Sequence, residues 1–201
     1  MSGRGVPMEA LKWGALGLMV WDHVAAVVYP HDLAYRLPGR FVFPVLAGLM
    51  ALHLARGYPP HRYIRKLWPF ALAAQPVYAW VFGLPLVWPL NVLFTLLAGV
   101  LMVRGRVWEG VGLSLLTEYP FGGPVVYFLS RGQPFWSALA LLACYAVFGW
   151  PLWALPMVAG VAGLSWYLVA RSVPGFRLPW WAGYLFYPGH LAILGVWSRG
   201  G

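Results

Sequence analysis

Apolar residues dominate the chain in long runs separated by short polar or proline- and glycine-rich segments. The first run, Ala10 to Tyr29, has about the 20 residues that one membrane-spanning helix needs. The later runs leave room for about eight spans joined by short loops. We therefore predict an all-α, polytopic transmembrane helical bundle that forms one integral membrane domain over residues 1–201, with spans at roughly 9–29, 39–56, 65–83, 88–103, 107–129, 134–148, 151–169 and 180–197.

The fifth predicted span has an unusual composition. It carries Pro120, Gly122, Gly123 and Pro124 close together. Proline removes a helical hydrogen bond, and non-helical backbone at membrane depth is tolerated only where protein or a cavity surrounds it. We predict that this helix is broken near its middle and that an internal site lies beside the break.

The composition supports the assignment to a membrane. Hydrophobic residues make up 61% of the chain and charged residues 9%, against about 45–50% and about 25% in ordinary soluble domains. The single cysteine, Cys144, excludes an intramolecular disulfide and is expected to be a small core residue. The net charge of +9 does not indicate nucleic-acid binding, because the basic residues lie at the ends of apolar runs.

The distribution of Lys and Arg predicts the orientation. The most basic segment follows the second span and contains Arg56, Arg62, Arg65 and Lys66. Cytoplasmic loops are enriched in Lys and Arg, so the N-terminus is predicted to be cytoplasmic. Arg171 and Arg177 conflict with that orientation; either the rule is weak there or the number of spans after residue 105 differs by one. The basic segment either anchors the topology or binds cytosolic phosphates.

Titratable side chains interrupt several apolar runs. A charged group at the bilayer centre costs at least about 2.5–3.5 kcal/mol, so such groups usually face the protein interior and mark function. With a rise of about 1.5 Å per residue, four of them lie at similar depths on three helices. We predict that they form one polar centre, with two further residues above it on the outer side: Asp22, His23, Glu118 and His190, with Arg40 and Asn91 above them.

Each of these residues also has a structural interpretation. Asp22 could pair with Arg40 to hold two helices together, Glu118 could cap the broken helix, and His53 could be hydrogen-bonded packing. The functional interpretation rests on chemistry: a neutral His can take a proton near pH 7, and a carboxylate can orient it. Adjacent helical residues point about 100° apart, so Glu118 is a better candidate than Asp22 to orient His23.

Other chemistries find less support. The chain has no GxSxG, P-loop or HExxH motif. Two histidines and two acids could hold a metal, but no pair has helical i, i+3 or i, i+4 spacing, so no metal site is predicted. A small-solute or ion transporter is the alternative function, because broken helices and intramembrane acids also mark transporters. The buried charges argue against a non-catalytic scaffold.

Six segments, in order, resemble the TraX family. LKWGALGLMVWDHV is similar to its opening helix with an Asp-His pair, and RLPGRFVFPVLAG to its next block. RYIRKLWPFALAAQPVY and LNVLFTLLAGVLMV resemble the third and fourth blocks, TEYPFGGPVV the acid-Tyr block, and FYPGHLAIL the closing Tyr-Pro-x-His-Leu block. The resemblance is tight over residues 11–103 and the C-terminal block, and it is loose over 127–178.

The resemblance implies N-terminal acetylation of a conjugative pilin and a fold similar to the transmembrane acyltransferases that acylate surface glycans. It implies acetyl-CoA as the donor, a multi-pass location in the bacterial plasma (inner) membrane, and as acceptor a pilin-like or other exported protein or a surface glycan. It carries to the residues that match its blocks: Asp22, His23, Gly39, Arg40, Pro44, Asn91, Glu118, Tyr187, Pro188 and His190.

A mechanism follows as a hypothesis. His23 acts as general base on an amine or hydroxyl acceptor, and Arg40 or Asn91 stabilises the oxyanion. His190 and Tyr187 orient the thioester or protonate the leaving thiol. The donor phosphates lie near the basic residues Arg56, Arg62, Arg65 and Lys66. Direct transfer is expected because no Ser, Cys or Thr is paired with a base in sequence, while an acyl-His intermediate stays open.

Overall fold

The computed structural model describes residues 6–30, 32–147, 154–173, 179 and 181–199, and these residues form helices and their connections. The all-α prediction is therefore confirmed for the described part of the chain. The helices are α1 (Met8–Val28), α2 (Leu33–Arg36), the 3₁₀ helix η1 (Pro38–Phe41), α3 (Val42–Ala55), α4 (Pro60–Phe82), α5 (Val92–Val103), α6 (Val107–Leu115), α7 (Gly122–Ser130), α8 (Pro134–Val147), α9 (Leu155–Ala170) and α10 (Ala182–Arg199).

Only part of the predicted membrane topology is visible in these helices. Met8–Val28 and Ala34–Ala55 are long and apolar enough to cross a bilayer. Helix α5, predicted as a span from residue 88, begins at Val92 and has 12 residues. That is about 18 Å of helix, well short of the roughly 30 Å hydrocarbon core. The structure supports a membrane-associated helical bundle and does not confirm eight spans; Arg177 and residues 151–153 lie outside the described residues.

The predicted break in the fifth span is confirmed. Helix α6 ends at Leu115 and α7 begins at Gly122. The connection is fixed by Leu90, whose N–H donates to Leu116 O at 2.8 Å and whose carbonyl accepts from Glu118 N at 2.8 Å. These two bonds satisfy backbone groups that a buried break leaves without helical partners. They also fix the position of Glu118.

Glycine allows α7 to approach its neighbours closely. A Cβ on Gly122 would lie 2.3 Å from Thr95 Cγ2 and 2.8 Å from Phe43 Cζ, so no larger residue fits there. The start of α7 is thereby packed against both α5 and α3. Cys144 is buried in α8, as expected of a small core residue, and its Sγ accepts a hydrogen bond from Phe121 N at 3.2 Å.

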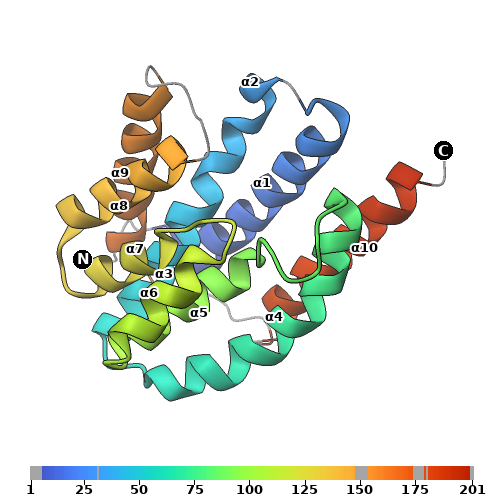
Figure 1. Ribbon diagram of the computed structural model, residues 1–201. Coiled ribbons are helices and arrows are strands. Elements are labelled where there is room, and N and C mark those ends of the chain that lie inside the picture. Colours follow the sequence, from blue (N-terminus) through green and yellow to red (C-terminus); the bar gives the residue numbers. More distant parts are fainter. Residues whose placement is uncertain (1–5, 31, 148–153, 174–178, 180, 200–201) are drawn as a thin grey trace.

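The helices are arranged around α1, α3 and α5. Helix α3 packs against α1, α7 and α9, and α5 packs against α4, α6 and α7. Helix α10 lies along α4 and also contacts α1. Figure 1 shows α8 and α9 on one side of the bundle and α4 and α10 on the other. The N-terminal and C-terminal helices therefore meet beside α4, and they bring together residues about 170 positions apart in sequence.

Candidate functional site

Two cavities adjoin inside the bundle, between α1, α3, α4, α5 and α10. The first, here called the basic-end cavity, has a volume of about 690 Å³, and its lining includes Lys12, His53, Arg56, Tyr58, Tyr63 and Lys66. The second, here called the polar cavity, has a volume of about 450 Å³, and its lining includes Asp22, His23, Arg36, Arg40, Glu118 and Tyr119. Three residues line both cavities and form what we call the junction: Met19, Val92 and Tyr187.

One face of α1 forms a wall of both cavities. Its lining residues recur every three or four positions, which is the spacing of a single helical face: Glu9, Lys12, Leu16, Met19, Asp22, His23 and Ala26. From Glu9 to Ala26 this face is about 25 Å long. Lys12 lies at one end and the Asp-His pair toward the other, so this face of α1 runs from the basic-end cavity to the acid and base groups of the polar cavity.

Asp22 is held by two arginines. Its Oδ1 is 2.5 Å from Arg40 Nη2, and its Oδ2 is 3.2 Å from Arg36 Nη2. Gly39 makes this approach possible, because a Cβ there would lie 2.4 Å from Asp22 Cβ. The expected pairing of Asp22 with Arg40 is present. Arg36 was not anticipated, although its spacing of four from Arg40 is that of one helical face.

His23 and His190 contact each other directly. His23 Nδ1 and His190 Nε2 are 2.8 Å apart, and the two rings are nearly parallel with centroids 5.0 Å apart. His190 Nδ1 lies 2.8 Å from the carbonyl oxygen of Phe186. A carbonyl only accepts, so a neutral His190 carries its hydrogen on Nδ1, and its Nε2 accepts from His23 Nδ1–H. These hydrogen bonds leave the lone pair of neutral His23 on Nε2, so Nε2 is the ring nitrogen that can act as a general base.

The contacts of His190 and Glu118 differ from those predicted for them. His23 lines the polar cavity, whereas His190 contacts His23 and is not among the residues that line that cavity. Glu118 also lines the polar cavity, but its carboxylate hydrogen-bonds the side chain of Tyr78. The His23 ring is therefore oriented by His190, and Glu118 is placed to meet a ligand in the cavity. Nor does Glu118 cap the broken helix: in the first turn of α7 it is Ser114 Oγ that accepts from Gly123 N, at 3.0 Å.

Asn91 has a structural position, in contrast to its predicted role at an oxyanion. Its Nδ2 donates to Ala71 O at 3.0 Å and to Gln75 Oε1 at 2.8 Å, which uses both amide hydrogens. Its Oδ1 accepts from Leu93 N at 3.0 Å and so caps α5. The side chain is fully buried. Asn91 thus fixes the start of α5 against α4 and has no donor left for a ligand.

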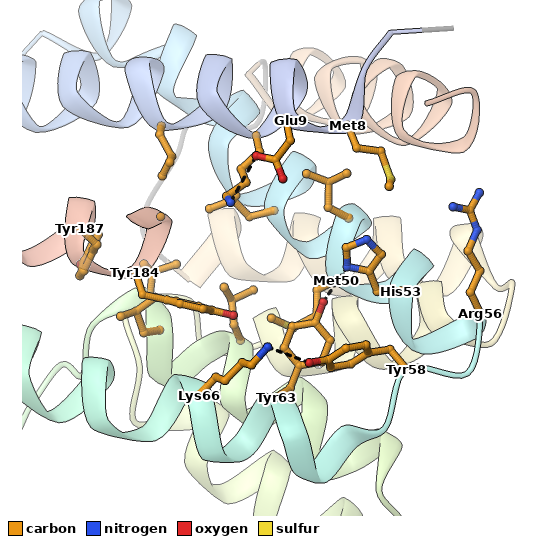
Figure 2. A pocket seen from close by; sticks show the side chains of 18 of the residues that line it. Met8, Glu9, Met50, His53, Arg56, Tyr58, Tyr63, Lys66, Tyr184 and Tyr187 are labelled. Atoms are coloured by element: carbon orange, nitrogen blue, oxygen red, sulfur yellow. Dashed lines mark hydrogen bonds and ion pairs between the residues drawn. The ribbon is translucent and has the colours of Figure 1, made fainter. Parts of the chain in front are cut away.

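The predicted donor-binding residues, three arginines and one lysine, divide into two pairs. Arg56 and Lys66 line the basic-end cavity, whereas Arg62 and Arg65 are exposed on another face of α4. Position 65 points about 100° away from position 66 on α4, and Arg62, in the first turn of α4, is exposed and does not line the cavity. Figure 2 shows Arg56 at one end of this cavity and Tyr187 at the other.

Aromatic hydroxyls contribute to this cavity and were not identified from the sequence. Lys66 Nζ donates to Tyr58 Oη at 3.0 Å, and His53 Nδ1 lies 2.8 Å from Tyr63 Oη (Figure 2). His53 is therefore hydrogen-bonded, as its structural interpretation had it, and it also faces the cavity. Tyrosine is common at the ends of membrane helices, so nothing in the sequence distinguished these residues from interfacial anchors.

The fold and the site define a class: a membrane-type helical bundle with a charged and histidine-containing cavity among apolar helices. Comparison with known proteins adds the family. Residues 7–110 match the TraX protein family. The chain is also 31% identical over 218 aligned residues to Protein TraX of Escherichia coli, covering 94% of this chain and 86% of that protein. The chain belongs to the TraX family. No solved structure matches it.

Proposed function

We propose that this protein is a membrane-embedded acyltransferase that moves an acetyl group from acetyl-CoA to an amine or hydroxyl at the membrane. Family membership supports a pilin-like or other exported protein as the acceptor, through its N-terminal amine; a surface glycan hydroxyl is the other candidate. The observation that carries the proposal is the pair of cavities meeting at one junction, with cations at one end and a histidine pair at the other.

The basic-end cavity suits the donor. Arg56, Lys66 and Lys12 line it, and such side chains bind phosphates through charge-assisted hydrogen bonds. From Lys12 to His23 is eleven residues, or about 16 Å along α1. An extended pantetheine arm reaches roughly 15–20 Å. With the phosphates at the basic end, the thioester therefore arrives at the junction beside His23.

The polar cavity suits the acceptor and the transfer. His23 Nε2 takes a proton from the acceptor nitrogen or oxygen as that atom bonds to the acetyl carbon. The C–S bond breaks, and the proton is delivered to the departing sulfur, which leaves as a thiol. Arg40, held by Asp22 at the cavity wall, supplies positive charge to the developing oxyanion, an effect typically worth about 3–4 kcal/mol.

A paired charge deletion tests the donor side. Arg56→Ala with Lys66→Ala should weaken acetyl-CoA binding at least about tenfold, because one charge-assisted hydrogen bond contributes about 1.5–3 kcal/mol. The matched control is Arg62→Ala with Arg65→Ala, which removes the same charge from the exposed face and should change affinity by less than about threefold. Calorimetry in detergent measures both; equal losses in the two double variants would contradict the assignment.

A transporter is the competing proposal, and the same junction motivates it, since two adjoining cavities could also pass a solute. Measurements of acetyl transfer and of solute flux distinguish an acyltransferase from a transporter. The acyltransferase proposal expects acetyl-CoA-dependent labelling of a supplied peptide amine by the purified protein in detergent. Liposomes that conduct solutes while the protein neither binds nor uses acetyl-CoA would favour the transporter.

We propose further that the chain is multi-pass, with its N-terminus and the Arg56–Lys66 segment on the cytoplasmic face. The excess of Lys and Arg in this segment supports that orientation. In a Cys144→Ala background, His61→Cys should react with an impermeant maleimide only after the cytoplasmic side is opened. Labelling of intact cells would invert the topology and with it the sides assigned to donor and acceptor.

A further inference from the structure

Tyr187 presents a hydroxyl that the fold itself does not use. The residue is 1% exposed and lies at the junction, where it lines both cavities. Its O–H has no acceptor among the described residues. A buried polar group without a partner costs about 1–3 kcal/mol. Phenylalanine would fill the same space without that cost, so the hydroxyl is a sign of a ligand.

The surroundings of Tyr187 are those of a reaction centre. Its ring makes edge contacts with His23 and His190, at centroid distances of 6.1 and 5.8 Å. Val92, the first residue of α5, directs its backbone N–H toward the Tyr187 oxygen. That N–H belongs to the first turn of a helix and has no acceptor within the helix. Asn91 fixes this end of α5 through its cap and its bonds to α4.

The proposed route of the acyl group determines which of its atoms lies beside the Tyr187 hydroxyl. A group that enters through the basic-end cavity and reaches His23 passes the residues that line both cavities, Met19, Val92 and Tyr187. When the acyl carbon lies within reach of an acceptor atom on His23, its carbonyl oxygen is beside the junction. Among the polar side chains of the described residues, that of Tyr187 alone lines both cavities.

We propose that the Tyr187 hydroxyl is the hydrogen-bond donor to the carbonyl oxygen of the transferred acyl group. This inference rests on the proposed acyltransferase function and assigns a role within that same site. The Tyr187 O–H donates a hydrogen bond to the thioester carbonyl oxygen. It keeps this bond, which strengthens as the oxygen gains negative charge. The N–H of Val92, at the positive end of the α5 dipole, polarises the O–H and strengthens it as a donor. No proton leaves Tyr187 during the step.

The test is Tyr187→Phe, which keeps the ring against both histidines and removes only the hydroxyl. Turnover of acetyl-CoA onto a peptide amine should fall about 10²- to 10³-fold. Affinity for acetyl-CoA should stay within about threefold, because the lost bond strengthens only in the transition state. The control is Tyr167→Phe on α9, an exposed tyrosine away from both cavities, which should keep wild-type turnover.

A second readout does not depend on turnover. In the infrared spectrum of bound acetyl-CoA carrying ¹³C in its carbonyl, wild type should lower the stretching frequency relative to free ligand, and Tyr187→Phe should abolish that shift. Wild-type turnover together with an unchanged shift in Tyr187→Phe would refute the role of the hydroxyl and leave the acyltransferase intact. Absence of both acetyl-CoA binding and transfer in the wild-type protein would overturn the proposed function, and this inference with it.

Discussion

His23→Ala should lower acetyl transfer by about 10²- to 10⁴-fold, the usual effect of losing a general base. The protein should remain folded and should still bind acetyl-CoA, because His23 lines the polar cavity whereas Arg56 and Lys66 line the other. The measurement is transfer to a supplied acceptor beside acetyl-CoA affinity, for each variant in detergent. His61→Ala is the control, since that histidine is exposed on α4 and lines neither cavity.

The contact between His23 and His190 predicts different effects for substitutions of the two histidines. His190 contacts His23 and the carbonyl of Phe186, so it orients the base without facing either cavity. His190→Ala should therefore reduce turnover less than His23→Ala does. If His23→Ala kept wild-type turnover, the base would lie elsewhere. His190 would be the next candidate, and the donor and acceptor sides would have to be exchanged.

The sequence predicts those parts of the site that a membrane makes costly. Charges inside apolar runs have to face one another, and Asp22, His23 and Arg40 do line a common cavity with Glu118. The break before α7 was also predictable, because clustered prolines and glycines favour a helix boundary: Pro120 lies in the connection, and Gly122, Gly123 and Pro124 form the first turn of α7. Depth along each helix brought His190 to the level of His23.

The sequence did not predict which side chains face a cavity or which groups they hydrogen-bond. Two arginines of one basic segment, Arg62 and Arg65, are exposed and do not line the cavity, which no count of charges along the sequence reveals. Asn91 looks like a polar residue at the outer end of a span, yet its amide hydrogens bond Ala71 and Gln75 on α4 and its oxygen caps the first turn of α5. Such assignments depend on which helices become neighbours. The predicted start of the fourth span at residue 88 was wrong for a related reason: Asn91 caps α5, which therefore begins at Val92.

Asp22→Ala should be the most destabilising single change in the polar cavity. Asp22 and Arg40 are 7% and 5% exposed, and their ion pair at 2.5 Å is buried. Removing one partner of a buried pair typically costs about 3–5 kcal/mol, because the other charge stays buried without its counterion. Arg36→Ala should cost much less, since that side chain is 31% exposed and Asp22 keeps Arg40.

A compensating variant shows whether the loss comes from the stranded charge. Asp22→Ala combined with Arg40→Leu replaces the pair by apolar groups, a change that is often neutral or stabilising for buried pairs. The double variant should therefore unfold at a higher temperature in detergent than Asp22→Ala alone, giving a coupling energy between the two sites. Additive losses would mean that the pair does not stabilise this end of the bundle. The double variant should nevertheless be inactive, because Arg40, whose charge is proposed to stabilise the oxyanion at the wall of the polar cavity, is gone. Restored stability without restored transfer would separate the structural role of Asp22 from the electrostatic role proposed for Arg40.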